Sequence, residues 1–310
     1  MRSVRVSLVA VGLLALFVPG PAAQHFSDWD LPVNLGPGVN SGFADQSPAL
    51  SKDGLSLYFQ SDRPGGEGNM DLWVSHRTSE DDPWGEAENL RDVVNSEAFE
   101  SRPTLSRDGH WLFFSSTRAG GFAPGLDLWA SYREHTHDDL AWQTPVHLGA
   151  GVNASGSSEI EASYVENDSG APQLYFVSNR PGGFGAFDVY VSELLASGDW
   201  GPATWVPELS STSPDQSISV RFDGREAFIV RGNAPLPAGF DLFVSRRETI
   251  SDPWSAPINL GPVVNSLTLD TSAHISDDRQ ALYFESTRAG GQGGADLWMT
   301  TRAKRVPQGR

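Results

Sequence analysis

Beyond its first two dozen residues, the chain is a succession of short runs in which apolar and polar positions alternate, without helical periodicity. In the first full unit these runs cover residues 47–51, 55–61, 71–76 and 88–94. Turn signals that contain glycine or proline, such as Asp53-Gly54 and Pro83, separate the runs. Because such alternation is typical of β-strands, the pattern predicts an all-β chain with four strands in each unit.

The same unit recurs five times along the chain. In each copy a strand-like run leads through Ser-x-Arg and a glycine pair, or a variant of them, to Asp-Leu-Trp or a close relative. The acids that mark the copies are Asp71, Asp127, Asp188, Asp241 and Asp296. The fourth copy departs most, because Arg231-Gly232-Asn233 replaces Ser-x-Arg and the glycine pair is lost. A spacing of roughly 53 to 61 residues is close to that of radial repeats, whose units need neighbours to bury their apolar faces.

A second signature predicts how the ring closes. Four units end in a tryptophan followed by a proline or a small residue, and these tryptophans are Trp84, Trp142, Trp200 and Trp254. A fifth, Trp29, lies near the N-terminus, whereas the last unit ends shortly after Trp298. We therefore expect the N-terminal strand to complete the last blade. The fold predicted is a five-bladed β-propeller of four-stranded blades, closed without open sheet edges.

The repeat motif also supports a resemblance to a known family. The segments SPALSKDGLSLYF and SDRPGGEGNMDLW resemble the WD-repeat-like unit of TolB-type and OmpA-associated envelope proteins. The resemblance covers nearly all of the chain after the leader and implies an exported, non-enzymatic propeller that binds or scaffolds a protein or glycan in the cell envelope. Because propellers host unrelated chemistries, it constrains the fold more than the function.

The N-terminal segment has the organisation of a secretory signal peptide. Arg2 and Arg5 precede an apolar run, and small residues follow it. We expect a signal peptide at 1–23, the propeller at 24–303 and a tail at 304–310, with the protein exported to the periplasm or secreted. No later apolar stretch is long enough to span a membrane. Since the chain has no cysteine, neither disulfides nor a lipid-modified cysteine are expected.

The negative net charge of the chain excludes some classes of binding partner. The formal net charge of −17 opposes binding to nucleic acid, whose backbone is also negative. The expected partner is an envelope protein or a glycan, bound by a monomer without a cofactor. His135 and His137 lie with two aspartates in REHTHDDL, but this polar loop offers no second shell for a metal, so no metal site is expected.

Acids and arginines recur at fixed places in the units. A carboxylate begins each expected innermost strand: Asp45, Glu100, Glu159, Asp215 and Asp270. The arginines of the Ser-x-Arg steps should reach the same face: Arg63, Arg118, Arg180 and Arg288. An arginine can hold a carboxylate with two hydrogen bonds, so each pair is expected to clip a loop to its own or a neighbouring blade.

The same acids allow an alternative function. Glycosidases need two carboxyl groups about 5 to 9.5 Å apart, and five-bladed propellers house such enzymes. By analogy with them, Asp45, Glu100 and either Glu159 or Glu161 could act on a carbohydrate in the central funnel. The repetition of the acids through all five units argues against this alternative.

Positions that break the equivalence of the units are the candidate ligand contacts, because a small molecule seldom has five-fold symmetry. They are Arg102, Glu161, Arg231, Asn233 and His274. Alternation along a strand predicts that the first, second and last of these share one side of the innermost strands. Packing at blade contacts is the alternative explanation for each of them.

Overall fold

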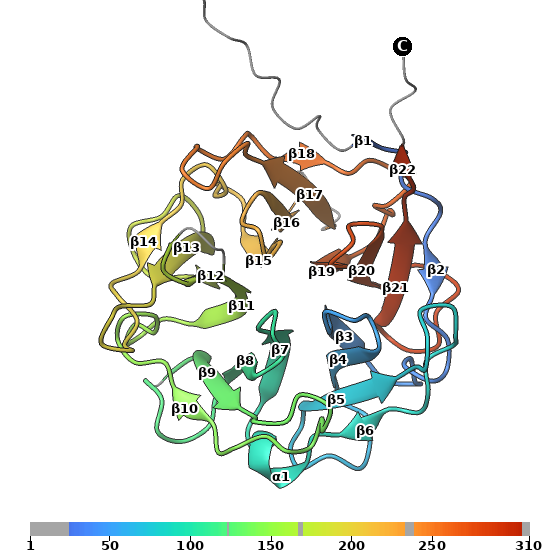
Figure 1. Cartoon of the computed structure of the whole chain (residues 1–310), viewed down its shortest axis with the longest axis horizontal. Helices are drawn as coiled ribbons and strands as arrows, with labels where there is room; N and C mark the ends of the chain where they lie inside the picture. The colour runs from blue at the N-terminus through green and yellow to red at the C-terminus, as the bar shows by residue number, and fades with distance from the viewer. Residues whose placement is uncertain (1–24, 123, 167–169, 233–238, 306–310) are drawn as a thin grey trace, which may run out of the picture.

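A computed structural model describes residues 25–122, 124–166, 170–232 and 239–305, which form one ring of five blades around a central axis (Figure 1). Each blade is a four-stranded antiparallel sheet. In blades 1 to 4 the strands follow chain order from the axis to the rim. The prediction of an all-β, five-bladed propeller with four strands in each blade is therefore confirmed.

The five blades share one plan. Blade 1 contains β3 (Asp45–Leu50), β4 (Ser56–Ser61), β5 (Asp71–His76) and β6 (Glu88–Asn89). Blade 2 contains β7 (Glu100–Leu105), β8 (Trp111–Ser116), β9 (Asp127–Tyr132) and β10 (Val146–His147). Blade 3 contains β11 (Glu159–Val165), β12 (Gln173–Ser178), β13 (Asp188–Glu193) and β14 (Thr204–Trp205). Blade 4 contains β15 (Asp215–Val220), β16 (Glu226–Gly232), β17 (Phe240–Arg246) and β18 (Ile258–Asn259). Blade 5 contains β19 (Asp270–Ile275), β20 (Ala281–Ser286), β21 (Asp296–Thr301) and β2 (Val33–Asn34).

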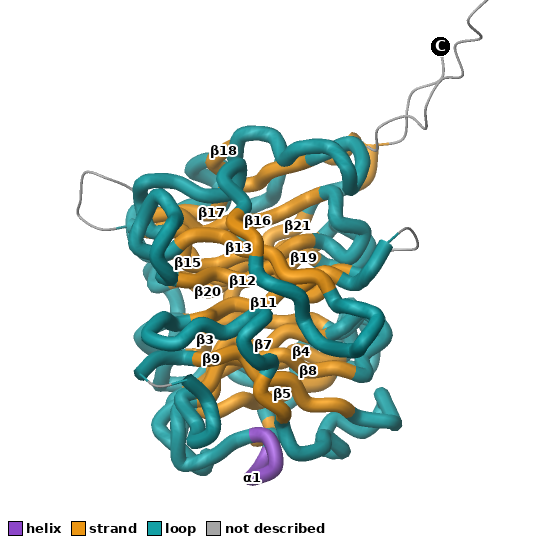
Figure 2. Tube along the Cα trace, turned by 90° about the vertical axis from the view of Figure 1, so that its left-hand side faces the viewer, coloured by secondary structure: helices purple, strands orange, loops and turns teal. Residues whose placement is uncertain are grey.

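The two ends of the described chain close the ring together. Val33 and Asn34 of β2 pair with Met299 and Trp298 of β21, as the tryptophan signature predicted. Outside the blades, β1 (His25–Phe26) pairs with β22 (Lys304–Arg305). Figure 2 shows the described ends side by side at one edge of the molecule. Both sheet edges that a linear array would expose are thus paired.

The outermost strands are shorter than the sequence pattern predicted. In blade 1 the expected strand over 88–94 ends at Asn89, and α1 (Arg91–Val94) follows it. This four-residue turn begins at Arg91, whose φ of 63° lies in the left-handed region. Val94 is fully buried, so the turn directs an apolar side chain inward where a continued strand would have alternated.

The second strand of each blade is apolar on both faces because blades cover it on either side. In β4, Leu57, Tyr58 and Phe59 have no exposed surface. Tyr58 packs in a cluster with residues of blade 2, whereas Leu57 and Phe59 pack in a cluster with residues of blade 5. The core therefore lies between blades and not within them, which is how a repeat without a core of its own becomes stable.

Every innermost strand carries a β-bulge near its start. The registers of β3, β7, β11, β15 and β19 against their neighbours all shift within the first five residues of the strand. At four of these bulges a residue other than glycine has a positive φ: Ser47, Arg102, Glu161 and Ser272. A bulge re-aims one side chain, and here it does so beside the propeller axis.

Some expectations concern residues that lie outside the described parts of the chain. The signal peptide expected at 1–23 and the candidate ligand contact Asn233 both lie there. Of the expected tail at 304–310, Lys304 and Arg305 form β22, and residues 306–310 are outside the description. Within the described ranges, no helix is long and apolar enough to cross a membrane.

Candidate functional site

The five acids that begin the innermost strands are fully buried. Each forms an ion pair with an arginine of its own blade: Asp45 with Arg63, Glu100 with Arg118, Glu159 with Arg180, Asp215 with Arg231 and Asp270 with Arg288. The Arg231 pair, 2.7 Å long, was not expected, because the fourth unit lacks the Ser-x-Arg step. This arginine comes from within β16, and its guanidinium reaches the same place as the other four.

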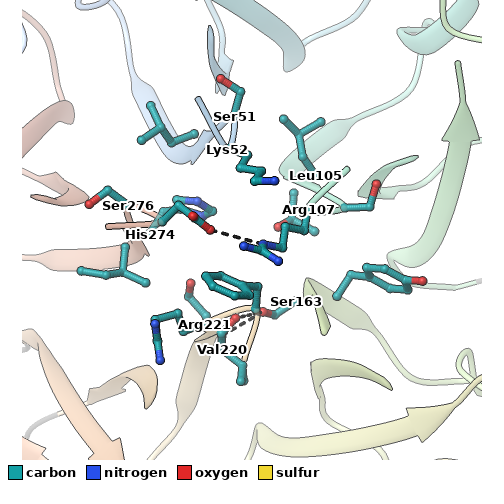
Figure 3. Close-up of a pocket in the computed structure, with 17 residues that line it drawn as sticks. Ser51, Lys52, Leu105, Arg107, Ser163, Val220, Arg221, His274 and Ser276 are labelled. Carbon is teal, nitrogen blue, oxygen red and sulfur yellow. Dashed lines mark hydrogen bonds and ion pairs between the residues drawn. The ribbon is translucent and has the colours of Figure 1, made fainter. Parts of the chain in front are cut away.

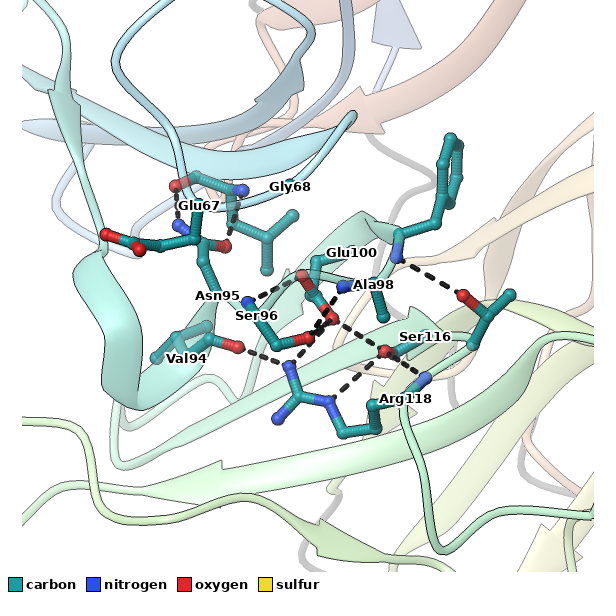
Figure 4. Close-up of polar contacts among 12 residues, drawn as sticks. Glu67, Gly68, Val94, Asn95, Ser96, Ala98, Glu100, Ser116 and Arg118 are labelled. Carbon is teal, nitrogen blue, oxygen red and sulfur yellow. Dashed lines mark hydrogen bonds and ion pairs between the residues drawn. The ribbon is translucent and has the colours of Figure 1, made fainter.

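Glu100 shows how completely these acids are engaged (Figure 4). Its carboxylate accepts hydrogen bonds from the Ser96 amide (2.9 Å), the Ser96 hydroxyl (2.7 Å) and the Ser116 hydroxyl (2.8 Å). The Arg118 guanidinium lies 3.0 Å away and also donates to the Val94 carbonyl. The acid thus ties the loop before its strand to the loop after the next strand.

Burial has the expected electrostatic effect on this ring. It raises the pKa of Glu159 and of Asp215 despite the hydrogen bonds and arginines that favour the charged forms. Burial also lowers the pKa of the Arg118 guanidinium. A catalytic carboxyl must reach the substrate, but Asp45, Glu100 and Glu159 have no exposed surface. We therefore assign none of these three a catalytic role.

Glu161 is the one member of the alternative catalytic set that faces other blades across the axis. Its carboxylate lies 2.8 Å from Nη1 of Arg102 on β7 and accepts a 3.0 Å hydrogen bond from the Ser217 hydroxyl on β15. Arg102 also donates to the Gln216 carbonyl at 3.0 Å, so a side chain of blade 2 reaches blades 3 and 4. The side chains of Arg102 and Glu161 are 24% and 12% exposed, and solvent therefore reaches this network.

A second axial carboxyl, Glu285 on β20, was missed by the sequence reasoning. Gln46 of blade 1 donates to it at 2.8 Å, and Gln60 donates in turn to the Gln46 side-chain oxygen at 3.0 Å. Gln60 also accepts a 2.8 Å hydrogen bond from the Arg102 amide, which connects Glu285 to the Arg102–Glu161 pair. We call these five side chains the axial network.

Burial raises the pKa of Glu285, and the negative charge of Glu161 acts in the same direction, whereas Arg102, Gln46 and Thr271 oppose the shift. The sequence contained a signal for this residue. When the second strands of the five blades are aligned, the other blades have Gln60, Ser115, Val177 and Val230 at the position of Glu285. Glu285 is therefore the single acid at this position of the repeat. Glu285 is 8% exposed, unlike the fully buried ring acids. A carboxyl with a raised pKa and an arginine-paired carboxylate on one network could act as an acid and a base.

The other end of the axis holds a small cavity of about 70 Å³ (Figure 3). Lys52 and Arg107 point toward its centre, whereas the Arg221 guanidinium turns away and pairs with Asp223. Arg107 pairs with Asp277 at 3.5 Å. His274 lines it as well, and burial lowers the pKa of this imidazole to about 4, against a main-chain hydrogen bond with Leu50. A volume of this size holds a few water molecules but no sugar ring.

The REHTHDDL loop forms no metal site in the described structure. His135 and His137 lie next to each other with ring centres 5.8 Å apart, but Asp139 points away to Tyr58 and Arg133. Among the residues described, no group of three or more histidine, cysteine, aspartate or glutamate side chains could hold a metal ion.

Comparison with solved structures identifies the fold and its neighbours. An α-L-arabinofuranosidase from Lactobacillus brevis has a TM-score of 0.59 at 11% identity, over 86% of this chain and 93% of that chain. An arabinanase from Bacillus subtilis has a TM-score of 0.57 at 13% identity, over 86% and 96% of the two chains. No family model matches the chain. No curated protein matches it either.

These neighbours correct the functional expectation. We expected a non-enzymatic binding or scaffold propeller in the cell envelope, yet the matching propellers are mostly arabinofuranosidases and arabinanases. TolB from Acinetobacter baumannii matches with a TM-score of 0.47 over 85% of this chain and 55% of that chain, which is too low to support the family resemblance. These neighbours therefore favour the alternative expectation, a carbohydrate hydrolase, over the scaffold expectation. At such identities the likeness itself establishes only the fold.

Proposed function

We propose that this protein is a carbohydrate-active enzyme of the glycoside hydrolase type, and that its working carboxyls are Glu161 and Glu285. The observation that carries the proposal is their joint place on the axial network. Glycosidases need one carboxyl that holds its proton near neutral pH and a second one that is ionised. Burial raises the pKa of Glu285 in the direction of the first property, and the Arg102 guanidinium at 2.8 Å is a partner for the negative charge that the second requires of Glu161.

In the proposed reaction Glu285 donates its proton to the glycosidic oxygen while the bond from that oxygen to the anomeric carbon breaks. Glu161 either takes a proton from the attacking water or adds to the anomeric carbon and is released by water in a second step. The separation of the two carboxyls during turnover decides between these routes. The anomeric form of the first product, followed by NMR, distinguishes inversion from retention.

Arg102 has a positioning role in this proposal. Its guanidinium holds the Glu161 carboxylate at 2.8 Å and is itself fixed by the Gln216 carbonyl at 3.0 Å. A positive φ of 55° at both Arg102 and Glu161 places these side chains at the bulges of adjacent innermost strands. Two neighbouring bulges thus hold an acid and its partner in fixed relation, as preorganised catalysis requires.

The proposed substrate class is suggested by the neighbours, which are arabinofuranosidases and arabinanases. We propose an arabinose-containing polysaccharide or oligosaccharide that enters from the end of the axis at which the innermost strands begin. The opposite end is closed to sugars by the small size of its cavity. The leader-like segment at 1–23 supports export to where such polymers occur, and the repeat motif alone supports a relationship to TolB-type repeats.

The test is hydrolysis of a substrate panel by the purified protein. The panel contains 4-nitrophenyl α-L-arabinofuranoside, arabinan, arabinoxylan and 4-nitrophenyl glycosides of other sugars. We expect release of arabinose or short arabinan fragments, and no release by Glu161→Gln. Absence of turnover on every member by the folded wild-type protein would overturn the proposal.

A further inference from the structure

Four of the five interfaces between blades contain an arginine clamp. The arginine follows the third strand of a blade, and its guanidinium lies over the tryptophan that precedes the outermost strand. The pairs and their distances to the ring centre are Arg77–Trp84 (4.4 Å), Arg133–Trp142 (4.4 Å), Arg247–Trp254 (4.2 Å) and Arg302–Trp29 (4.4 Å). Each clamp covers a tryptophan face that would otherwise lie open between two blades.

The preceding blade completes the clamp. Tyrosine hydroxyls accept from the arginine at three interfaces: Tyr58 from Arg133 (3.0 Å), Tyr175 from Arg247 (3.2 Å) and Tyr283 from Arg77 (3.2 Å). At the interface of blades 4 and 5 a phenylalanine, Phe228, takes the place of the tyrosine. There Glu226 pairs with Arg302 at 3.3 Å instead.

Between blades 2 and 3 the clamp is missing. Leu194 stands where the other blades have the arginine, and Phe113 stands where three of them have the tyrosine. A groove of about 630 Å³ opens at this interface. Its size falls within the range of about 300 to 1,000 Å³ that is usual for ligand pockets. Since the repeat fills the same place elsewhere, the opening is a property of this interface and not of the fold.

Aromatic rings line this groove, which we call the blade 2/3 groove. Tyr164 stacks on Phe113 at 5.2 Å, and Trp200 stands edge-on to Tyr164 at 6.3 Å. Trp111, which is 36% exposed, lies at its rim and stacks on Phe113 at 6.4 Å. Trp200 is partly exposed, as is the clamped Trp29, whereas the clamped Trp84, Trp142 and Trp254 are buried.

Polar groups stand beside these rings, and the fixed charge among the lining residues is the Asp199 carboxylate. His147 and Asp199 line it together with the main chain of the turn from Gly149 to Gly151, and its lining residues include neither lysine nor arginine. The pKa of the Tyr164 hydroxyl is raised to about 12 by burial and nearby acids, so this group remains a hydrogen-bond donor. A ligand with an apolar ring face and a rim of neutral hydroxyls fits this combination, whereas anions do not.

We propose that the blade 2/3 groove binds a sugar ring of a neutral polysaccharide and is a non-catalytic site that holds the polymer on the flank of the propeller. The ring would lie against Trp111 and Trp200, with its hydroxyls toward Asp199 and the 149–151 turn. This proposal deepens the proposed function through the substrate class, but binding here requires no turnover. The two can therefore fail separately.

The sharpest test rebuilds the missing clamp. The double variant F113Y/L194R supplies the tyrosine and arginine that the other interfaces contain and should fill the groove without loss of stability. Binding of arabinan, xylan and dextran is measured by affinity gel electrophoresis and calorimetry. We expect the wild-type protein to bind at least one polymer, and both F113Y/L194R and Trp111→Ala to weaken that binding at least about tenfold.

Two controls keep the outcomes distinct. Ile258→Ala removes an exposed apolar side chain from β18, at the position of the groove residue Val146, and should leave binding unchanged. All variants should hydrolyse small aryl glycosides as the wild type does. Unchanged polymer binding by F113Y/L194R would overturn the proposal, as would binding of 8-anilinonaphthalenesulfonate in the groove without binding of any polysaccharide.

Discussion

The Nη1 atom of Arg102 lies 2.8 Å from the carboxylate of Glu161, and this ion pair joins the bulges of two neighbouring innermost strands. In the ring acids, by contrast, carboxylate and arginine belong to the same blade and are repeated five times. The pair of Arg102 and Glu161 occurs once and is reached by solvent. A contact that is repeated in every blade stabilises the fold. A polar contact that occurs once, at the axis of a near-symmetric ring, is not required by the repeat and is therefore a candidate for function.

The ring acids should be required for stability. Replacing Arg63 with alanine leaves the fully buried Asp45 without its ion pair, which should cost about 3 kcal/mol and lower the melting temperature by roughly 6 °C or more. Thermal unfolding followed by circular dichroism measures this. The matched control is Lys304→Ala, whose partner Asp278 is exposed and which should change stability by less than about 0.5 kcal/mol. Equal melting temperatures for both variants would contradict the structural role of the ring.

The second glycine of the glycine pair should be intolerant of a side chain. A Cβ at Gly66 would lie 1.9 Å from Oδ2 of Asp71, the carboxylate that caps the hairpin through the Glu67 and Gly68 amides. Gly66→Ala should therefore destabilise the protein by about 2 kcal/mol in a urea titration. At Gly42 nothing lies within 4 Å of such a Cβ, and Gly42→Ala should be nearly neutral. A neutral Gly66→Ala would show that the hairpin can rearrange.

His274 should make the protein sensitive to mild acid. Its folded pKa of about 4 lies below the ordinary value near 6.5, so below that value the unfolded chain takes up a proton that the folded chain resists. Stability from this residue is complete above pH 6.5 and is lost as the pH falls toward 4. Between pH 7 and pH 4.5 this residue should cost the wild-type protein on the order of 2 kcal/mol of folding stability. The variant His274→Thr, which copies Thr104 of blade 2, should not show this loss. Urea titrations of both proteins at the two pH values measure the difference. Parallel pH profiles for the two proteins would exclude this effect.

Glu285 should make folding stability depend on pH in the direction opposite to His274. Its pKa is raised in the folded state, so above the ordinary value near 4.3 the unfolded chain releases a proton that the folded chain retains. Folding stability from this residue is therefore complete at acid pH and falls as the pH rises through the raised value. Glu285→Gln should flatten this part of the profile and be relatively more stable at pH 8 than at pH 4, as thermal unfolding measures. A steeper fall in the variant would show that Glu285 is ionised in the folded protein.

The sequence predicted the architecture well because the fold rests on repeated local features. Alternation, Asp-Gly turns and the displaced Trp29 were sufficient for the blade number and for the pairing of β2 with β21. The axial network was predicted only in part. Arg102 and Glu161 were selected because they break the repeat, but their ion pair depends on bulges that bring two strands together. Such bulges leave no clear mark in the alternation of residues.

Other features depend on contacts between distant segments. Glu285 lies in the second strand of its blade, where the expected burial drew attention to packing and not to chemistry. The blade 2/3 groove arises from residues as far apart as Phe113 and Leu194, whose meaning appears only when the other interfaces are aligned in space. The function expected from the repeat motif was wrong, because a motif that builds blades carries little information about the axis they surround.

The most direct test of the central claim is the rate of sugar release from arabinan by the wild-type protein and by Glu285→Gln, measured as reducing ends over a range of pH. Glu88→Gln, on the exposed rim of blade 1, is the matched control. We expect the control to match the wild type and Glu285→Gln to lose activity by about 100-fold or more, together with the alkaline limb of the pH profile. Full activity in folded Glu285→Gln, with an unchanged pH profile, would contradict the assignment of the axial carboxyls.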